Sequence, residues 1–333
     1  MKVCAVGCGE HATSSHGPAL ARYAATHPPV ELAACCDVDP ERAERHRARF
    51  GFARAYTNAM AMIAAERPDA VALVVPEAVT CEVGVELLRR GVPLLIEKPP
   101  GRTLDELDRL AAAAAAGGGG DPVPHQVAFN RRFVPLVREA RRRLAALASA
   151  APIQHLHYEM TRVDRRDPDF SATAIHGFDA VRFLAGCDYA RVRFRYREMP
   201  EHGPGVANIL ADGVLASGAT AQLAFCPVAG VVVERATVHA GRHTLHLRVP
   251  MWGAVDSPGR LEHFEGGARR DDLSGAAPGE APPAWELGGF YAEYEAFLGD
   301  LQAGRVPAPS LRDARQSVEI AACVSRRESE YIA

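Results

Sequence analysis

Glu97 and Lys98 follow directly after an apolar run, residues 93–96, and precede a Pro-Pro-Gly turn. The run predicts a buried strand, which the prolines cannot continue. Open α/β sheets bind their ligands at the carboxyl ends of such strands. A lysine placed there, with its pKa lowered by desolvation, could take up or release a proton during a reaction. The alternative is a structural lysine whose side chain extends to water.

A glycine-rich turn follows the first apolar strand, Lys2–Val6. It has the pattern Gly7-x-Gly9-x-x-Ala12, the dinucleotide-binding fingerprint with alanine in the third place. The two glycines allow a tight turn and let a pyrophosphate approach the amino terminus of the next helix. Alone the pattern is weak evidence, but it follows a strand and precedes an acidic residue at the end of the next strand.

That acidic residue is Asp37, which ends the apolar strand Glu31–Cys36. A carboxylate at this place accepts hydrogen bonds from the ribose hydroxyls of NAD and repels the 2′-phosphate of NADP. The sequence therefore favours NAD(H) over NADP(H). Helix capping is the alternative role for Asp37, but Asp39, followed by Pro40, already fits that role.

Strands and helices alternate through residues 1–124, which is typical of a doubly wound parallel sheet. Residues 70–75 are nearly all apolar, as in a strand covered on both faces. The other expected elements are a helix over 81–90, a strand over 93–96 and a helix over 103–116, capped by Thr103 with Glu106 three residues later. We expect a Rossmann domain over residues 1–124.

The pattern changes after residue 124. One helix, 134–147, is followed by strands, some with period-2 alternation, as in an antiparallel sheet with one face on a core. The expected strands are 153–162, 190–198, 206–211, 219–225, 231–240 and 244–249, followed by an irregular excursion over 253–283 and helices over 290–303 and 311–326. We expect a second domain over residues 125–333, in which the last helices can pack back on the first.

The composition of the chain argues against several classes of protein. The 333 residues carry a net charge of −3, which leaves no basic footprint for nucleic acid. No signal peptide and no membrane-spanning apolar run are recognisable, so a cytoplasmic protein is expected. The eight cysteines contain no CxxC pair, and we expect neither a disulfide framework nor a metal site.

The motifs together resemble those of the Gfo/Idh/MocA oxidoreductases, the relatives of glucose–fructose oxidoreductase and inositol dehydrogenase. The resemblance covers nearly the whole chain, and Glu97-Lys98-Pro99 is its specific part. The other matching parts are the Gly7/Gly9 turn, Asp37 and residues 127–133 and 175–179. The resemblance implies a Rossmann domain followed by an open-faced, mainly antiparallel sheet domain whose exposed face makes homo-oligomer contacts.

By this resemblance, Lys98 lies beside the nicotinamide, His176 approaches from the second domain, and Glu97 helps to hold the cofactor ribose. Lys98 and His176 are the expected catalytic residues, since removal of a hydride from an alcohol requires that the hydroxyl proton also leave. A histidine satisfied by local hydrogen bonds is the alternative reading of His176. The expected cofactor-binding residues are Gly7, Cys8, Gly9, Glu10, His11, Asp37, Val75, Pro76, Glu97 and Lys98.

The substrate residues follow less directly from the sequence. The guanidinium of Arg132 would suit a carboxylate, phosphate or nucleotide sugar, and surface charge is its alternative role. Asp179, one turn after His176, either meets the substrate or only supports the helix. The expected substrate residues are Arg132, Asp169 and Asp179.

The chain departs from the family pattern at two places. Four residues before His176 the family usually carries an aspartate, and here that residue is Ala172. Asp164, Asp167 and Asp169 are the possible substitutes in the preceding loop. The other departure replaces a Pro-Asn pair and a later histidine by Pro76, Glu77 and Thr80.

The expected function is an NAD(H)-dependent oxidoreductase acting on a hydroxyl or keto carbon of a sugar, cyclitol or sugar-derived metabolite. One rival keeps the cofactor but makes the net reaction redox-neutral, as in epimerisation, elimination or rearrangement by transient oxidation. Ala172 gives that rival weight, because the usual proton relay lacks its carboxylate. The second rival is a non-catalytic NAD-binding sensor.

Overall fold

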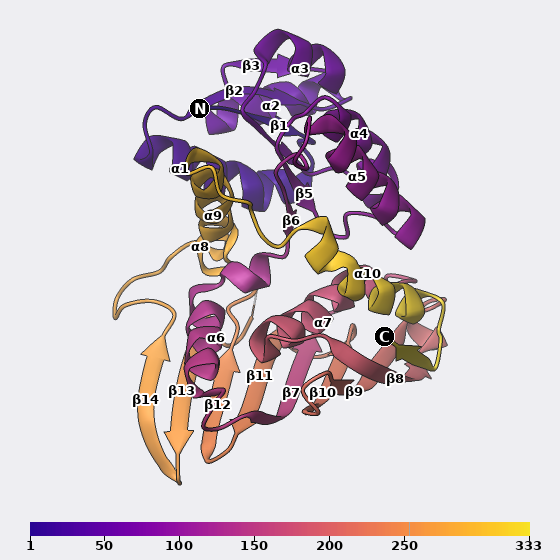
Figure 1. The fold of residues 1–333 in the computed structure, drawn as a ribbon, viewed down its shortest axis with the longest axis vertical. Coiled ribbons are helices and arrows are strands. Elements are labelled where there is room, and N and C mark those ends of the chain that lie inside the picture. Colours follow the sequence, from indigo (N-terminus) through magenta and orange to yellow (C-terminus); the bar gives the residue numbers. More distant parts are fainter. Residues whose placement is uncertain (253) are drawn as a thin grey trace. The chain divides into compact units, whose positions relative to one another are not determined.

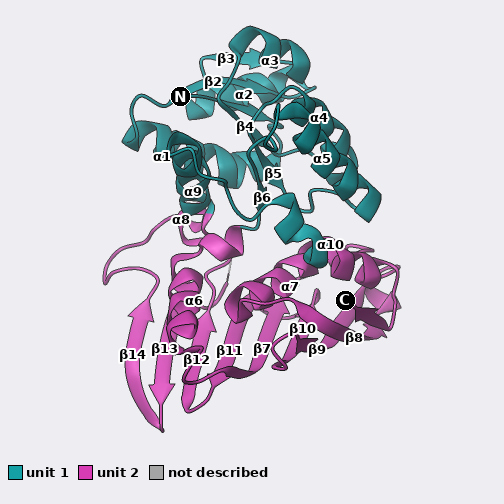
Figure 2. Cartoon of the chain, viewed as in Figure 1, with its two compact units in different colours: residues 1–129, 290–318 teal, residues 130–289, 319–333 magenta. Residues whose placement is uncertain are grey.

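The computed structural model describes residues 1–252 and 254–333, and it divides into two compact units (Figure 2). The first unit comprises Met1–Phe129 and Phe290–Val318, and the second comprises Asn130–Gly289 and Glu319–Ala333. The first unit thus extends past the expected boundary at residue 124, because residues 125–128 form a strand of its sheet.

The sheet of the first unit is parallel, with strand order β3-β2-β1-β4-β5-β6. This is the predicted doubly wound arrangement, and the strand order reverses between β1 and β4, where such sheets bind ligands. The four residues of β4 are all buried, as expected for a sheet covered on both faces. The strands are β1 (Lys2–Val6), β2 (Glu31–Cys36), β3 (Arg54–Tyr56), β4 (Ala70–Leu73), β5 (Leu94–Glu97) and β6 (His125–Ala128).

Two helices of the first unit, α2 and α5, begin where the sequence indicates, whereas α4 begins at Glu77, four residues before the expected start at residue 81. The Asp39 side chain accepts hydrogen bonds from the backbone N–H groups of Glu41 and Arg42, and Thr103 accepts one from Glu106. Helix α1 packs against α9, and α4 packs against α5 (Figure 1). The helices are α1 (Gly17–Thr26), α2 (Pro40–Phe50), α3 (Ala59–Glu66), α4 (Glu77–Arg89), α5 (Leu104–Gly117) and α9 (Phe290–Gln302); α10 (Leu311–Ser325) contributes residues to both units.

The second unit contains a nine-stranded sheet of order β14-β13-β12-β11-β7-β10-β9-β8-β15. Among the named strands of the described residues, only β7 and β10 pair in parallel, so the predicted mainly antiparallel sheet is confirmed. Helices α6 (Pro135–Leu147) and α7 (Ser171–Ala185) lie along one face of it (Figure 1). The strands are β7 (Ile153–Thr161), β8 (Tyr189–Glu198), β9 (Ala207–Leu215), β10 (Thr220–Cys226), β11 (Val233–Ala240), β12 (His243–Arg248), β13 (Arg260–Glu265), β14 (Ala268–Ser274) and β15 (Glu330–Ile332).

The expected irregular excursion over 253–283 is wrong for about half of its length. Residues 260–274 form the hairpin of β13 and β14, and Gly253 lies outside the described residues. The hairpin turns at Gly266 and Gly267, whose φ angles are 58° and 90°. Its strands lie at the edge of the sheet and carry charged side chains on both faces, so they lack the apolar alternation that identifies a half-buried strand.

In the described part of the chain, no helix combines the length and the apolar character needed to cross a membrane. The cytoplasmic location and the homo-oligomer predicted from the sequence stay predictions.

Candidate functional site

The glycine turn lies where β1 ends and the first helix begins. Gly7 has a φ angle of +97°, and a Cβ atom on it would lie 1.9 Å from the carbonyl oxygen of Val74. Only glycine fits there. Gly9 has open space where its Cβ would be, and its carbonyl accepts the N–H of Thr13 at 2.9 Å. A phosphate group can therefore approach the backbone at Gly9 and the amino terminus of the helix.

We expect alanine at these two glycines to have opposite effects. Gly7→Ala should lower the melting temperature sharply, because the methyl group meets the Val74 carbonyl in a positive-φ conformation. Gly9→Ala should fold normally and weaken NADH binding, because its methyl group enters the space that a pyrophosphate needs. Thermal unfolding and NADH fluorescence titration of both variants check this. Equal loss of stability in the two variants would contradict the assignment.

A cavity of about 850 Å³ opens beside this turn. It is lined by residues of the glycine turn and by basic side chains of α2. The electrostatic field of these basic side chains favours an anionic ligand. The lining residues are Cys8, Gly9, Glu10, Thr13, Ser14, Arg42, Arg45, His46 and Arg49.

Asp37 is fixed to the turn through its carboxylate. One oxygen, Oδ2, accepts the backbone N–H of Cys8 at 2.9 Å, and Oδ1 accepts that of Asp39 at 3.0 Å. Each oxygen keeps a further lone pair. The carboxylate beside the glycine turn can therefore accept ribose hydroxyls without leaving these two donors.

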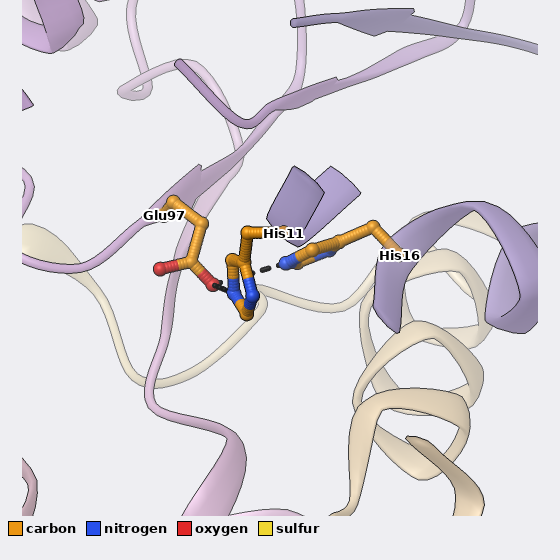
Figure 3. Close-up of side chains that lie close together, drawn as sticks. All are labelled: His11, His16 and Glu97. Carbon is orange, nitrogen blue, oxygen red and sulfur yellow. Dashed lines mark hydrogen bonds and ion pairs between the residues drawn. The ribbon is translucent and has the colours of Figure 1, made fainter. Parts of the chain in front are cut away.

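Glu97, the last residue of β5, is the centre of a buried hydrogen-bond network (Figure 3). Its Oε1 lies 3.1 Å from Nε2 of His11 and 3.0 Å from Nε2 of His16. Nδ1 of His16 lies 2.8 Å from the hydroxyl of Tyr294, on α9. When Tyr294 donates to Nδ1, His16 donates to Glu97, and every group along this line is satisfied.

The network keeps Glu97 ionised. Burial opposes the charge, but the electrostatic effect of His11, the histidine hydrogen bonds and the charge of Lys98 together hold the carboxyl pKa well below its usual range. Burial also lowers the pKa of His16, so that ring is neutral near pH 7. Glu97 is thus a carboxylate at the ligand-binding edge of the sheet.

Lys98 follows Glu97 immediately and is half-buried. It stands at the carboxyl edge of the parallel sheet, to which β1 and β4 also bring their carboxyl ends. Val75 lies beside the glycine turn, with a side-chain carbon 3.1 Å from where a Gly7 Cβ would be, and Pro76 precedes α4. The first unit therefore gathers Gly7, Asp37 and Lys98 at one edge.

His176 lies in the second unit, on α7, where it is 4% exposed. The backbone next to His176 packs closely against the sheet. A Cβ on Gly177 would lie 2.5 Å from the ring of Phe225, on β10. The helix therefore runs close to the sheet at this point. Ala172 lies one turn before His176 on the same helix.

Two of the expected substrate residues bind each other. Arg132 donates Nε to Asp179 Oδ2 at 2.8 Å and Nη2 to Oδ1 at 2.7 Å, a bidentate pair with Asp179 almost fully buried. Asp179 lies on α7, so the pair ties that helix to the segment that enters the second unit. This observation favours a supporting role for both side chains.

The three aspartates of the loop before α7, which were expected as substitutes at the site, also have partners. Asp164 accepts from Arg166 at 2.7 Å, and Asp167 accepts from Arg165 at 2.8 Å. Asp169 accepts the Ser171 backbone N–H at 2.8 Å, at the start of α7, and the Ser325 hydroxyl at 2.6 Å. All three carboxylates therefore stabilise the loop or the start of α7.

His16 and Tyr294 were not expected at the site. The sequence signal for His16 is its spacing of five residues from His11, which an ordinary α-helix would not place on one face. Residues Ala12–His16 form a π-helical turn, a feature that sequence patterns do not reveal. Tyr294 lies 278 residues from His16 in the chain, and no local pattern joins them.

Residues 1–119 match the sequence profile described as an oxidoreductase family with an NAD-binding Rossmann fold, Gfo/Idh/MocA. The first part of the chain is thus similar to the Rossmann domain of the Gfo/Idh/MocA oxidoreductases. Inositol 2-dehydrogenase 4 of Saccharopolyspora erythraea is 30% identical to it over 214 residues, which are 61% of this chain and 60% of that relative. The alignment thus spans less than two thirds of the relative's length.

Solved structures extend the similarity of fold to nearly the whole chain. A dehydrogenase from Chromobacterium violaceum has a TM-score of 0.83 at 20% identity and covers 98% of this chain and 95% of its own. Levoglucosan dehydrogenase in complex with NADH has a TM-score of 0.82 at 18% identity, covering 100% and 98%. At these identities the likeness concerns the fold.

Proposed function

We propose that the protein is an NAD(H)-dependent oxidoreductase that acts on a hydroxyl or keto carbon of a sugar or cyclitol. The observation that supports this most is the arrangement at one sheet edge of a glycine turn with open space at Gly9, an anchored Asp37 and the pair Glu97-Lys98. Two of the three proteins named above are an inositol 2-dehydrogenase and a levoglucosan dehydrogenase, and the substrates in these names are polyhydroxylated rings.

The residues present fit a dinucleotide. The backbone at Gly9 and the helix amino terminus would hold the pyrophosphate, Asp37 the adenosine ribose, and Glu97 the nicotinamide ribose. The second carboxylate oxygen of Glu97, Oε2, is suited to a hydroxyl, because both histidines lie at Oε1. Bound NAD⁺ supplies a hydride acceptor for the carbon that carries the substrate hydroxyl.

The arginines of the neighbouring cavity raise the question of NADP. Arg42 is paired with Asp39 at 3.2 Å, and Arg45 with Glu41 at 3.2 Å, so acidic neighbours partly compensate both charges. Asp37 adds a negative charge next to the ribose position. We infer that NAD(H) is preferred, with the arginine side chains available to adenine or pyrophosphate.

The protein's own chemistry in this reaction is proton handling. Lys98 takes up the hydroxyl proton or donates a hydrogen bond to the oxyanion that develops as the hydride leaves. His176 is the proposed second acid–base group, since imidazole titrates near neutral pH. In the reverse direction the same groups return the proton to the carbonyl oxygen.

A redox-neutral reaction is the second candidate, and Ala172 favours it. Without a carboxylate one turn before His176, the usual proton relay of the family is incomplete. Transient oxidation to a ketone acidifies the neighbouring C–H bond, so a single site can oxidise, epimerise or eliminate, and reduce again. The cofactor would then remain bound and regain its initial state at each turnover.

Absorbance of NADH distinguishes the two candidates. The protein is incubated with NAD⁺ and, separately, with myo-inositol, levoglucosan and simple glucosides, and parallel samples contain NADP⁺. We expect NADH to accumulate with at least one of these compounds, and much less NADPH. Conversion of a substrate with no change in absorbance would support the redox-neutral candidate, and failure to bind either nucleotide would contradict both.

A further inference from the structure

Three side chains in the first unit offer metal-ligand atoms to a common point. These are His11 Nε2, His16 Nε2 and Glu97 Oε1, and each histidine nitrogen lies 3.0–3.1 Å from the carboxylate oxygen (Figure 3). Around a tetrahedral zinc ion with bonds of about 2.0–2.1 Å, neighbouring ligand atoms are about 3.3–3.4 Å apart. The two histidine–carboxylate separations therefore need to widen by only a few tenths of an ångström, and all three ligand atoms lie within 4.8 Å of one another.

The π-helical turn is what brings the two histidines together. In an α-helix with 3.6 residues per turn, side chains five residues apart point about 140° away from each other. Here the N–H of Gly17 bonds to the carbonyl of Ala12, five residues back, so the turn is widened. The wider turn directs His11 and His16 toward the end of β5, where Glu97 lies.

The surroundings also suit a metal ion. Nδ1 of His16 lies 2.8 Å from Tyr294, and metal-binding histidines commonly donate their second nitrogen to such a partner. A shift of the His16 proton to Nδ1 would direct it to the tyrosine oxygen and free Nε2 for a metal. His16 and Glu97 are buried, whereas the side chain of His11 is 39% exposed, which gives an ion access from solvent.

We propose that His11, His16 and Glu97 form a binding site for one divalent transition metal ion, with Zn²⁺ as the best match. Two imidazoles and one carboxylate are a donor set that zinc accepts, and three protein ligands leave the fourth position open. Magnesium and calcium prefer sites made of oxygen atoms alone. His11 and His16 are close in the sequence, but Glu97 lies 81 residues after His16. The chain therefore carries none of the usual cysteine or histidine spacing motifs of a metal site.

Metal binding should compete with the dinucleotide. This consequence rests on the proposed function, in which Glu97 holds the nicotinamide ribose. An ion on Glu97 would withdraw the carboxylate from the ribose hydroxyl and place positive charge beside Lys98 and the positively charged nicotinamide ring of NAD⁺. Zinc would therefore act as an inhibitor that NAD⁺ displaces.

Cobalt absorption and zinc calorimetry test the site on the purified chain without nucleotide. We expect one Zn²⁺ per chain and an intense Co²⁺ d–d spectrum typical of four-coordination. His11→Gln should weaken binding at least about tenfold, because loss of a direct ligand costs no less than loss of a supporting partner, about 10–100-fold. His11 is the partly exposed ligand, so this variant should fold, and His27→Gln, outside the cluster, is the matched control.

X-ray absorption of the zinc-loaded protein gives a second, variant-free measurement. Nitrogen and oxygen neighbours alone are expected, whereas sulfur in the first shell would show that one of the eight cysteines binds the ion and would overturn the proposal. Equal zinc affinity in His11→Gln and wild type would also overturn it. NADH titration with and without Zn²⁺ distinguishes the metal site from the proposed function. Zinc binding without NADH binding would contradict only the proposed function, and NADH binding without zinc binding would contradict only the metal site.

Discussion

Replacement of Lys98 by methionine is expected to lower turnover about 10²–10⁴-fold, the usual contribution of a positioned acid–base group. The dissociation constant of NADH should change little, because in the proposed arrangement the glycine turn, Asp37 and Glu97 hold the pyrophosphate and the ribose groups. Methionine has a similar length and no ionisable group. The variant therefore loses the group that exchanges a proton but keeps a side chain of similar volume. Steady-state kinetics and NADH titration of the variant check both parts.

The composition of the chain strengthens this expectation and supplies its control. Lys98 is one of only two lysines, the other being Lys2, in a chain with 38 lysine and arginine residues. Arginine cannot lose its proton in proteins, so it serves elsewhere as a cation but not as an acid–base group. Lys98→Arg should therefore fail like Lys98→Met, and the exposed Lys2→Met should be as active as wild type. Undiminished turnover in Lys98→Met would refute the proposed mechanism.

Replacement of Glu234 by glutamine is expected to destabilise the second unit by about 3–5 kcal/mol, the cost of breaking a buried ion pair. Glu234, on β11, is fully buried and accepts from Arg131 at 3.0 and 3.2 Å, from Arg162 at 2.6 Å and from the Tyr158 hydroxyl at 2.6 Å. Glutamine has the same shape but leaves two buried guanidinium groups without a counter-charge. Urea or thermal unfolding measures the loss.

The exposed pair between Arg193 and Glu330, 3.0 Å apart, is the matched control. Glu330→Gln should change stability by no more than about 1 kcal/mol, because solvent screens that pair. Similar losses in the two variants would mean that the buried network contributes no more than a surface contact.

The same carboxylate should make stability depend on pH. Burial opposes its ionisation, but Arg131 and Arg162 lower the pKa of Glu234 to about 2, below the value of 4.5 usual for glutamate. A depressed pKa gives stability that is present above pH 4.5 and is lost as the pH falls toward 2. Unfolding curves across that window should fall more steeply for wild type than for Glu234→Gln. Parallel curves would contradict this assignment.

Much of the fold could be predicted because its signals are local. Asp39 and Thr103 cap the helices that their sequences indicate, and the buried strand β4 reads as a run of apolar residues. The hairpin of β13 and β14 was missed because an edge strand with charged faces has the composition of a loop. Short elements such as β3 and β15 gave no pattern of useful length.

Some residues of the candidate site could likewise be predicted from the sequence, and others could not. Gly7, Asp37 and Lys98 were predictable because each follows a strand of a parallel sheet, and the carboxyl ends of such strands share one edge. The contact of His16 with Tyr294 was not predictable, since it joins residues 278 positions apart. The pairing of Arg132 with Asp179 likewise follows from tertiary packing, and the sequence alone left Arg132 open as a substrate ligand.

The central claim is that Lys98 handles the substrate proton beside bound nicotinamide. A crystal structure with NADH and a polyol that the protein converts tests it most directly. We predict that Lys98 Nζ lies within hydrogen-bond distance of the reacting oxygen, with the nicotinamide C4 against the carbon that bears it. Nicotinamide bound away from Lys98, or a substrate oxygen contacted only by other groups, would contradict the account.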